Sequence, residues 1–330
     1  MYAAYARYDF SQPLAALALT AAVHGLLAKR AMSGSLVWLS AMFLTRPELG
    51  VLIGWIGGWL ALDARRAGWR VVAWRVTAVV VSVLAAVALY LGANQARFGD
   101  WARTGHASAS WLFAVSGPRL LEGALGLLLS PSHGLLIFHP LTWLAIPGLS
   151  RLIKDRHPAG LLWSGIVLMA FAFYAFYKGW WAGWSWGPRF LVPVLPLLTL
   201  AAAAFAAQSP RRGPRRLFVA LAAAGVGVAG NGILLDFVLY YRWLEKVGGV
   251  PDSPASQFAL VASPLVSGWR FLAAAPVDLL LTRMGEFGGA LGTVAAVLIA
   301  SVLLGALAWS GRLILAALRE ADAAEPALSS

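Results

Sequence analysis

The chain has no cysteine among its 330 residues, and only 12% of them are charged. The first absence excludes disulfide bonds and thiolate metal sites, although it does not identify a compartment. So small a fraction of charged residues is untypical of soluble globular proteins. No GxxxxGK[ST] sequence and no glycine-rich loop after a strand is present, so the usual signals of a nucleotide site are missing as well.

Apolar residues make up 60% of the chain. They gather in segments that approach the roughly 20 residues needed to cross a bilayer. These segments lack the alternation of barrel strands, so helices must satisfy their backbone groups in lipid. The sequence therefore predicts an all-α, polytopic integral membrane protein with about nine transmembrane helices. The predicted segments are 12–28, 34–45, 48–62, 72–93, 134–150, 160–177, 189–207, 217–240 and 290–310.

Basic residues outnumber acidic ones by 26 to 14, which gives a formal charge of +12. In a membrane protein such residues hold cytoplasmic loops against anionic lipid, so we expect no nucleic-acid partner. Nine spans place every basic cluster on one side, which the positive-inside rule makes the cytoplasm. The clusters are Lys29-Arg30, then Arg65, Arg66, Arg70 and Arg75, then Arg151, Lys154 and Arg156, then Arg211, Arg212, Arg215 and Arg216, and finally Arg312 and Arg319.

This topology predicts a single transmembrane domain over residues 1–310, with the N-terminus outside, and a cytoplasmic tail over 311–330. The acidic, small-residue end of the tail is typical of disorder. The abundance of Ala, Gly and Arg favours a bacterial source, and hence the inner (plasma) membrane. The main outer loops are then 94–133, 178–188 and 241–289.

Arg46-Pro47-Glu48 interrupts the apolar stretch 34–62. Two short helices turning there keep the flanking basic clusters on one side, and Pro47 suits the first position of the second helix. The functional interpretation is that Arg46 binds an anionic lipid headgroup and that Glu48 orients it. Snorkelling combined with local capping is an equally good explanation.

Residues 178–189 read KGWWAGWSWGPR, so four tryptophans lie between Lys178 and Arg189. An aromatic belt at the headgroup level accounts for part of this pattern. The functional alternative is that Trp181, Trp184 and Trp186 stack on a sugar or a polyprenyl chain while the two cations hold a phosphate. The interleaved glycines would let the backbone approach such a ligand.

Other polar residues lie in the predicted outer loops. Asp9 and Asp100 are carboxylates close to spans, for which a solvated loop position is the ordinary explanation, and Arg97 is a further cation. His133 and His139 are six residues apart and do not share a helical face as an i, i+4 metal pair would, so we expect structural histidines and no metal site. Ser130-Pro131 predicts the end of an interfacial helix over 120–129.

Five segments together resemble bacterial membrane glycosyltransferases of the GT-C class, in the superfamily of the protein O-mannosyltransferases and aminoarabinose transferases. They are YDFSQPLAALALTAAVHGLLA (8–28), FLTRPELG (43–50), NQARFGDWARTG (94–105), LLLSPSHGLLIFHPLTWLAIPGL (127–149) and WWAGWSWGPRFLVPVLP (180–196). The resemblance covers roughly residues 5–200, and the last segment is the most specific. Gln12 stands where relatives often have Glu.

The resemblance implies transfer of a sugar from a polyprenyl-phosphate carrier to a glycan, lipid or protein acceptor outside the cytoplasm, with no further cofactor. It places the catalytic Asp of the family upstream of the matched region, so we expect a chain that lacks its N-terminal part and is inactive alone. Arg46, Lys178 and Arg189, followed by Arg97, would neutralise the leaving phosphate. Asp9 and Asp100 are weak candidates for a carboxylate role. The alternative function is a non-enzymatic transporter or a cell-envelope assembly component.

Overall fold

The computed structural model describes residues 11–28, 32–103, 117–183, 185–234, 237–247, 249, 253–271, 289–295, 297–298, 301, 305 and 312. Within these ranges the regular secondary structure is α-helix or 3-10 helix, and no strand occurs. The predicted all-α class is thus confirmed for the described part of the chain.

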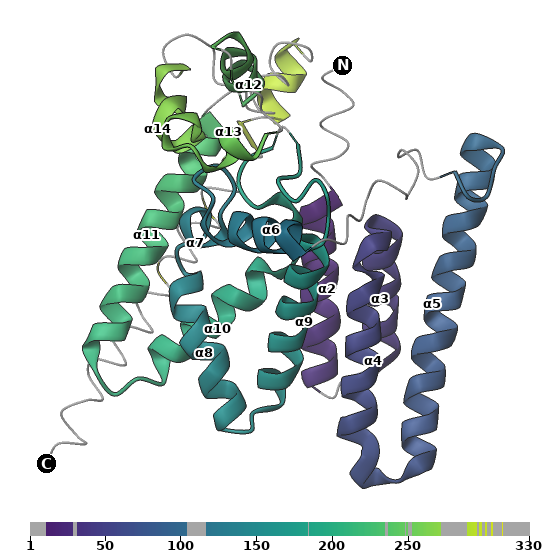
Figure 1. Ribbon diagram of the computed structural model, residues 1–330. Helices are drawn as coiled ribbons and strands as arrows, with labels where there is room; N and C mark the ends of the chain where they lie inside the picture. The colour runs from purple at the N-terminus through teal and green to yellow at the C-terminus, as the bar shows by residue number, and fades with distance from the viewer. Residues whose placement is uncertain are drawn as a thin grey trace, which may run out of the picture.

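The first four helices run up and down in sequence, and α5 forms the outer edge of the molecule (Figure 1). They are α2 (Ser11–Leu27), α3 (Met32–Thr45), α4 (Gly50–Ala64) and α5 (Trp69–Phe98). The chain turns between α3 and α4 at Arg46, and the short helix η1 (Pro47–Leu49) leads into α4 with Pro47 at its first position. Because proline lacks the N–H that is unpaired there anyway, it suits this position. The predicted division into two helices at Arg46-Pro47-Glu48 is confirmed.

The second half of the chain packs against α2 and α4. It comprises α8 (Thr142–Lys154), α9 (Pro158–Ala175), η4 (Arg189–Val194), α10 (Leu195–Ala207) and α11 (Arg212–Leu234). The predicted segment 134–150 is divided, because the short α7 (Leu135–Phe138) ends at His139 in front of Pro140. A residue before proline is driven out of the helical region, and proline has no N–H to donate. Most of the predicted segment 290–310 lies outside the described residues.

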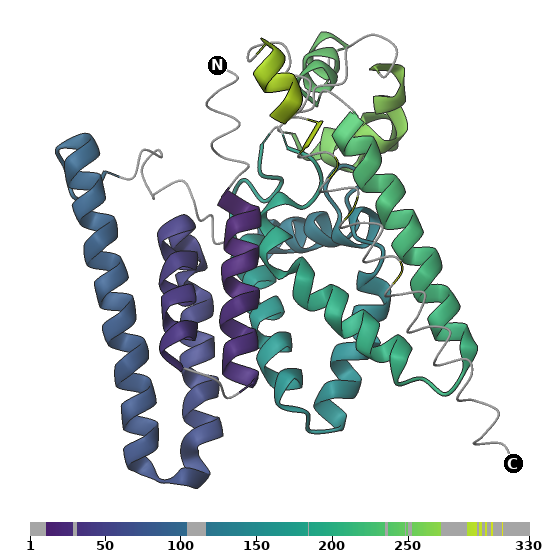
Figure 2. The same cartoon turned by 180° about the vertical axis from the view of Figure 1, so that it is seen from behind.

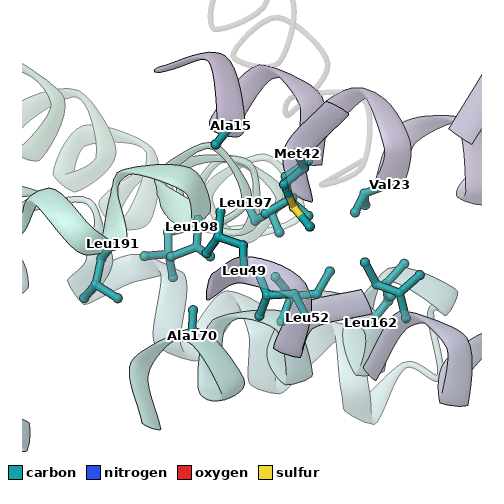
Figure 3. Close-up of a cluster of buried hydrophobic side chains, with 14 of the residues drawn as sticks. Ala15, Val23, Met42, Leu49, Leu52, Leu162, Ala170, Leu191, Leu197 and Leu198 are labelled. Carbon is teal, nitrogen blue, oxygen red and sulfur yellow. The ribbon is translucent and has the colours of Figure 1, made fainter. Parts of the chain in front are cut away.

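The core lies where α2, α3, α4, α9, η4 and α10 meet (Figure 3). Leu19, Met42, Leu52 and Ile166 are fully buried there. Small residues let the helices come close together. A side chain on Gly148 of α8, for example, would collide with the Ala201 carbonyl of α10. Close backbone approach through small residues is typical of helix packing in membranes.

Three described segments are long and apolar enough to cross a membrane: Trp69–Phe98, Pro158–Ala175 and Arg189–Ala207. Ser11–Leu27 and Met32–Thr45 are shorter apolar helices. Helix α5 carries large apolar side chains that are exposed, among them Trp74, Val81 and Leu84. Such surface is costly in water and favourable in lipid, so these helices indicate a membrane-associated protein. Nine spans remain a prediction.

The two ends of the helix bundle differ in composition. At one end lie three turns, between α4 and α5, α8 and α9, and α10 and α11 (Figures 1 and 2). Basic residues lie in these turns or in the helix ends beside them, among them Arg65, Arg156 and Arg211, and the first turn includes the short helix η2 (Arg65–Ala67). We call this the basic end. At the opposite end, α6 (Gly117–Leu129) lies across the bundle. A helix over 120–129 is thus confirmed, and its interfacial position stays a prediction.

Short helices cover the bundle beyond α6 (Figure 1). They are α12 (Phe237–Lys246), α13 (Pro254–Phe258), η5 (Leu260–Ala262), α14 (Pro264–Ser267) and η6 (Gly268–Phe271). We call this opposite end, with α6 and these helices, the capped end. The candidate residues Arg46 and Lys178 follow the ends of α3 and α9 that point towards it, and Arg189 is the first residue of η4.

Candidate functional site

Arg46 lies in the turn at the end of α3, and only 9% of its surface is exposed. Its Nε is 2.6 Å from Oε1 of Glu48, and its Nη1 donates to Oγ of Ser11 at 3.3 Å. The pairing of Arg46 with Glu48 that the sequence suggested therefore exists in the structure. Burial of a charge is expensive unless it is paired, which accounts for this contact.

Aromatic rings lie on the other side of the Arg46 side chain. The Cζ atom of Arg46 lies 5.8 Å from the centroid of the Phe190 ring. That ring stacks on Tyr174 with centroids 4.6 Å apart and planes inclined by 2°, and it meets Tyr177 edge-on at 5.3 Å. Phe190 comes from η4 and Tyr174 from α9, so two elements far from α3 in the sequence meet Arg46 at this point. We call Ser11, Arg46, Glu48, Tyr174, Tyr177 and Phe190 the Arg46 cluster.

The predicted cations Lys178 and Arg189 flank the Arg46 cluster along the chain. Lys178 directly follows Tyr177 and is exposed, and Arg189 directly precedes Phe190 at the start of η4 and is half-buried. The structure thus brings the chain segments of three predicted cations to one place. It does so although they follow α3, α9 and residues 179–188, which we call the tryptophan loop, respectively.

The tryptophan loop packs largely against protein. Trp180 is 3% exposed, and its Nε1 donates to Oε1 of Glu122 on α6 at 3.2 Å. Trp181 meets it edge-on at 5.7 Å. Trp186 meets Phe138 edge-on at 5.4 Å and is half-buried. Trp184 lies outside the described residues, and ligand stacking by the other indoles stays a prediction.

Positive φ angles shape the same loop, with 67° at Gly183 and 61° at Gly187. Ala182 also adopts a positive φ, at 65°, which is uncommon for a residue with a side chain. A Cβ on Gly187 would lie 2.8 Å from the Phe138 ring. Gly187 therefore permits close approach of the loop to α7, within the protein itself.

Arg97 and Asp100 lie apart from the Arg46 cluster. Both are exposed at the end of α5, the outermost helix in both views of the molecule. Oδ1 of Asp100 accepts from the N–H of Ala102 at 2.9 Å, which closes a local turn. The ordinary explanation for Asp100, a solvated loop carboxylate, fits this geometry. Asp9 lies outside the described residues.

A buried polar network, whose partners the sequence did not predict, joins the turn after α6 to the short helices of the capped end. His133 is 1% exposed; its Nδ1 is 2.7 Å from Oε1 of Gln257, and its Nε2 is 3.4 Å from the hydroxyl of Tyr241. Tyr241 also donates to the Ser185 carbonyl at 3.1 Å. Burial lowers the pKa of His133 from 6.5 to about 4, so its imidazole is neutral at physiological pH. No pattern in the sequence links residues so far apart.

Serine hydroxyls extend this network to α13 and α14. Ser130 Oγ donates to the Gln257 carbonyl at 2.6 Å and accepts from the N–H groups of Ser132 and His133. Ser263 Oγ donates to the Pro131 carbonyl at 2.6 Å. We call the network of Ser130, Ser132, His133, Tyr241, Gln257 and Ser263 the SPSH lock.

His139 has a structural role of the kind expected. Its Nδ1 lies 2.9 Å from Oγ1 of Thr142, and its Nε2 lies 3.1 Å from Oγ1 of Thr199. It therefore ties the start of α8 to α10. Among the residues that the structure describes, no group of three or more His, Cys, Asp or Glu side chains is placed to hold a metal ion.

The Arg46 cluster combines charged and aromatic groups at the end of α3. It offers a buried guanidinium, phenol groups and aromatic faces, next to the apolar helices α3, α4 and α9. Comparison with protein-family models, with curated proteins and with solved structures found no match. The resemblance to GT-C glycosyltransferases thus stays a hypothesis, and the residues themselves must carry the functional argument.

Proposed function

We propose that the chain is a membrane glycosyltransferase-like protein that binds a polyprenyl-phosphate sugar at the Arg46 cluster and serves transfer of the sugar to an extracytoplasmic acceptor. The observation that carries this proposal is the buried Arg46, paired with Glu48 and set over Phe190 at the end opposite the basic turns. A guanidinium suits phosphate because its fork of N–H donors matches the phosphate oxygens.

The chemistry needs charge neutralisation at this position. In the proposed reaction an acceptor hydroxyl or amine forms a bond to the anomeric carbon, and the bond from that carbon to the phosphate oxygen breaks. The lipid phosphate leaves with the electron pair, and the acceptor's proton passes to a base. Arg46, Lys178 and Arg189 would stabilise the charge that develops on the phosphate. Asp100 lies apart from the Arg46 cluster, so neither it nor Asp9 is assigned as this base, and both stay weak candidates for a carboxylate role.

The proposal includes a topology of nine spans in the bacterial inner membrane, with the basic end in the cytoplasm and the capped end outside. It is supported by the collection of basic turns at one end of the bundle. Because basic residues favour the cytoplasmic side, this arrangement puts the Arg46 cluster outside. A donor met there arrives on a lipid carrier, in keeping with the lack of a nucleotide loop.

The test is binding of polyprenyl phosphate to the purified chain in lipid nanodiscs, with the uncharged polyprenol as the competitor. We expect weak binding that is selective for the phosphate form, without sugar transfer by this chain alone. Arg46→Ala should weaken it about tenfold or more, since hydrogen bonds to charged groups contribute about 1.5–3 kcal/mol. Equal affinity for polyprenol and polyprenyl phosphate would contradict the proposal.

Two variants separate binding from folding. Replacing Arg46 and Glu48 together by glutamines removes both charges without leaving one buried alone, so the Tm should hold while phosphate binding falls. Arg75→Ala is the matched control, because Arg75 pairs with Asp63 at 2.7 Å at the basic end. Binding by Arg75→Ala that falls as far as that of Arg46→Ala would remove the cluster from the site. Translocation of the sugar lipid without any sugar transfer would favour the transporter alternative.

A further inference from the structure

A cavity lies at the basic end, where α4 and η2 face the turn between α8 and α9. Its volume is about 450 Å³, within the range of small-molecule sites. It is lined by Trp59, Leu62, Asp63, Arg65, Ile153, Arg156, His157, Pro158 and Leu161. The Arg46 cluster, at the other end of the bundle, shares none of these residues.

The charge of this cavity is positive. The negative charge of Asp63 is balanced by Arg75, because Oδ2 of Asp63 lies 2.7 Å from Nη1 of Arg75. Arg65 and Arg156 are exposed, and neither takes part in an ion pair within the described ranges. Nδ1 of His157 accepts from the N–H of Ala159 at 3.2 Å, which leaves Nε2 of the ring as a further donor.

Close packing fixes the walls of the cavity. The Trp55 indole of α4 donates to the Leu162 carbonyl of α9 at 3.3 Å, which holds the two helices together beside the opening. A Cβ on Gly160 would lie 2.6 Å from the backbone of Leu152, so the turn from α8 to α9 is tight. Arg156 has a φ of 52°, which reverses the chain at this turn.

The remaining lining is apolar and accessible. Leu62, Ile153 and Leu161 are each roughly half exposed, whereas Trp59 is buried at the back. Leu161 belongs to α9, one of the helices able to cross a membrane. The apolar side of the cavity therefore continues onto a surface suited to lipid, and the cations lie at the end of that surface.

We propose that this cavity binds an anionic membrane phospholipid, with the headgroup phosphate held by Arg65, Arg156 and His157 and the acyl chains along Leu62, Ile153 and Leu161. A soluble phosphate would leave the exposed apolar lining uncovered, and a neutral lipid would leave the two arginines without a counter-charge. Basic pockets between membrane helices on the cytoplasmic side take lipid headgroups of this kind. The inference does not depend on the proposed glycosyltransferase function.

The experiment is photo-crosslinking of the whole chain in phosphatidylcholine nanodiscs that contain a small fraction of photoactivatable phosphatidylglycerol. Crosslinked peptides are identified by mass spectrometry. We expect labelling of 59–65 and 153–161 in the wild type. Arg65→Gln and Arg156→Gln should each reduce it about fivefold, since each cation near the surface contributes about 1 kcal/mol of attraction to anionic lipid.

Matched controls make the result specific. Arg211→Gln changes an exposed arginine at the same end that does not line the cavity. Labelling of the cavity peptides in this variant should therefore equal that in the wild type. Three outcomes would overturn the proposal: equal labelling by a photoactivatable phosphatidylcholine, loss of labelling on addition of glycerol phosphate, or unchanged labelling in both cavity variants. Thermal unfolding of each variant in the same nanodiscs verifies that the fold is intact.

Discussion

The indole of Trp55 on α4 fills the space that a side chain at Gly165 on α9 would need. Its Nε1 donates at 3.3 Å to the Leu162 carbonyl, one turn earlier on the same helix. Gly165 thus lets a large ring lie directly on the α9 backbone. This contact joins the N-terminal helices to the second half of the chain, because α4 belongs to the first and α9 to the second.

Gly165→Ala is expected to destabilise the protein by about 1–3 kcal/mol, the usual cost of an extra group in a packed core. Gly58→Ala is the control: Gly58 lies within α4, and a Cβ at that position would meet no atom within 4 Å, so this variant should not lose stability. Thermal unfolding in detergent measures both. In a Trp55→Ala background, the Gly165→Ala change should cost little, and a full cost there would contradict this packing explanation.

The SPSH lock predicts a local effect of a single hydroxyl. Ser130→Ala removes the hydrogen bond to the Gln257 carbonyl and the acceptor for two turn N–H groups. Buried groups left unsatisfied cost about 1–3 kcal/mol, so segment 253–271 should be released from the bundle more often. Limited proteolysis of that segment should be faster than in wild type. Ser150→Ala, an exposed serine that donates to its own helix, should leave the rate unchanged.

His133 makes the same lock sensitive to acid. Burial lowers its pKa in the folded protein to about 4, against 6.5 for the free side chain. The unfolded or opened state therefore binds a proton more readily, and the stability present above pH 6.5 is lost as the pH falls through about 4. The groups facing the ring, Gln257, Tyr241 and the Ser185 carbonyl, include no carboxylate to hold the added charge.

We expect hydrogen exchange of 253–271 to accelerate as the pH is lowered from 6.5 to about 4, after correction for the intrinsic rate. His133→Gln should abolish most of this additional acceleration, because glutamine does not titrate. The matched variant His24→Gln, at an exposed histidine of α2, should retain it. Identical pH profiles for wild type and His133→Gln would show that another group is responsible.

The sequence predicted local features better than distant contacts. Apolar runs located α2, α5, α9 and α10, and Arg46-Pro47-Glu48 located the turn into α4, because each signal lies within one continuous stretch. The contact of Arg46 with Glu48 was predictable for the same reason. The position of Phe190 beneath Arg46 was not, since it depends on how η4 packs against α2 and α9.

The buried polar networks could not be predicted from the sequence, because they too depend on contacts between distant segments. Ser130, His133 and Gln257 are ordinary loop residues when each is considered by itself. They become a lock only when 253–271 folds back over the turn after α6. Trp180, which was not among the residues predicted to stack on a ligand, packs within the protein: its indole donates to Glu122 and covers Gly126 of α6.

The proposed topology can be tested at the two ends of α5. This helix has 30 residues and is therefore about 45 Å long, enough to cross a bilayer completely. Ala67 precedes it at the basic end, Ala102 follows it at the other, and both are exposed. Because the chain has no cysteine, Ala67→Cys and Ala102→Cys each introduce a single thiol.

In intact cells, a membrane-impermeant maleimide should label Ala102→Cys and not Ala67→Cys, because the basic clusters hold the Ala67 end in the cytoplasm. After the cells are opened, both variants should react equally, which shows that each thiol is accessible. Labelling of Ala67→Cys alone in intact cells would invert the topology and place the Arg46 cluster in the cytoplasm. Labelling of both would mean that α5 does not cross the membrane. The basic end and the capped end would then not lie on opposite sides of the membrane, as the proposal requires.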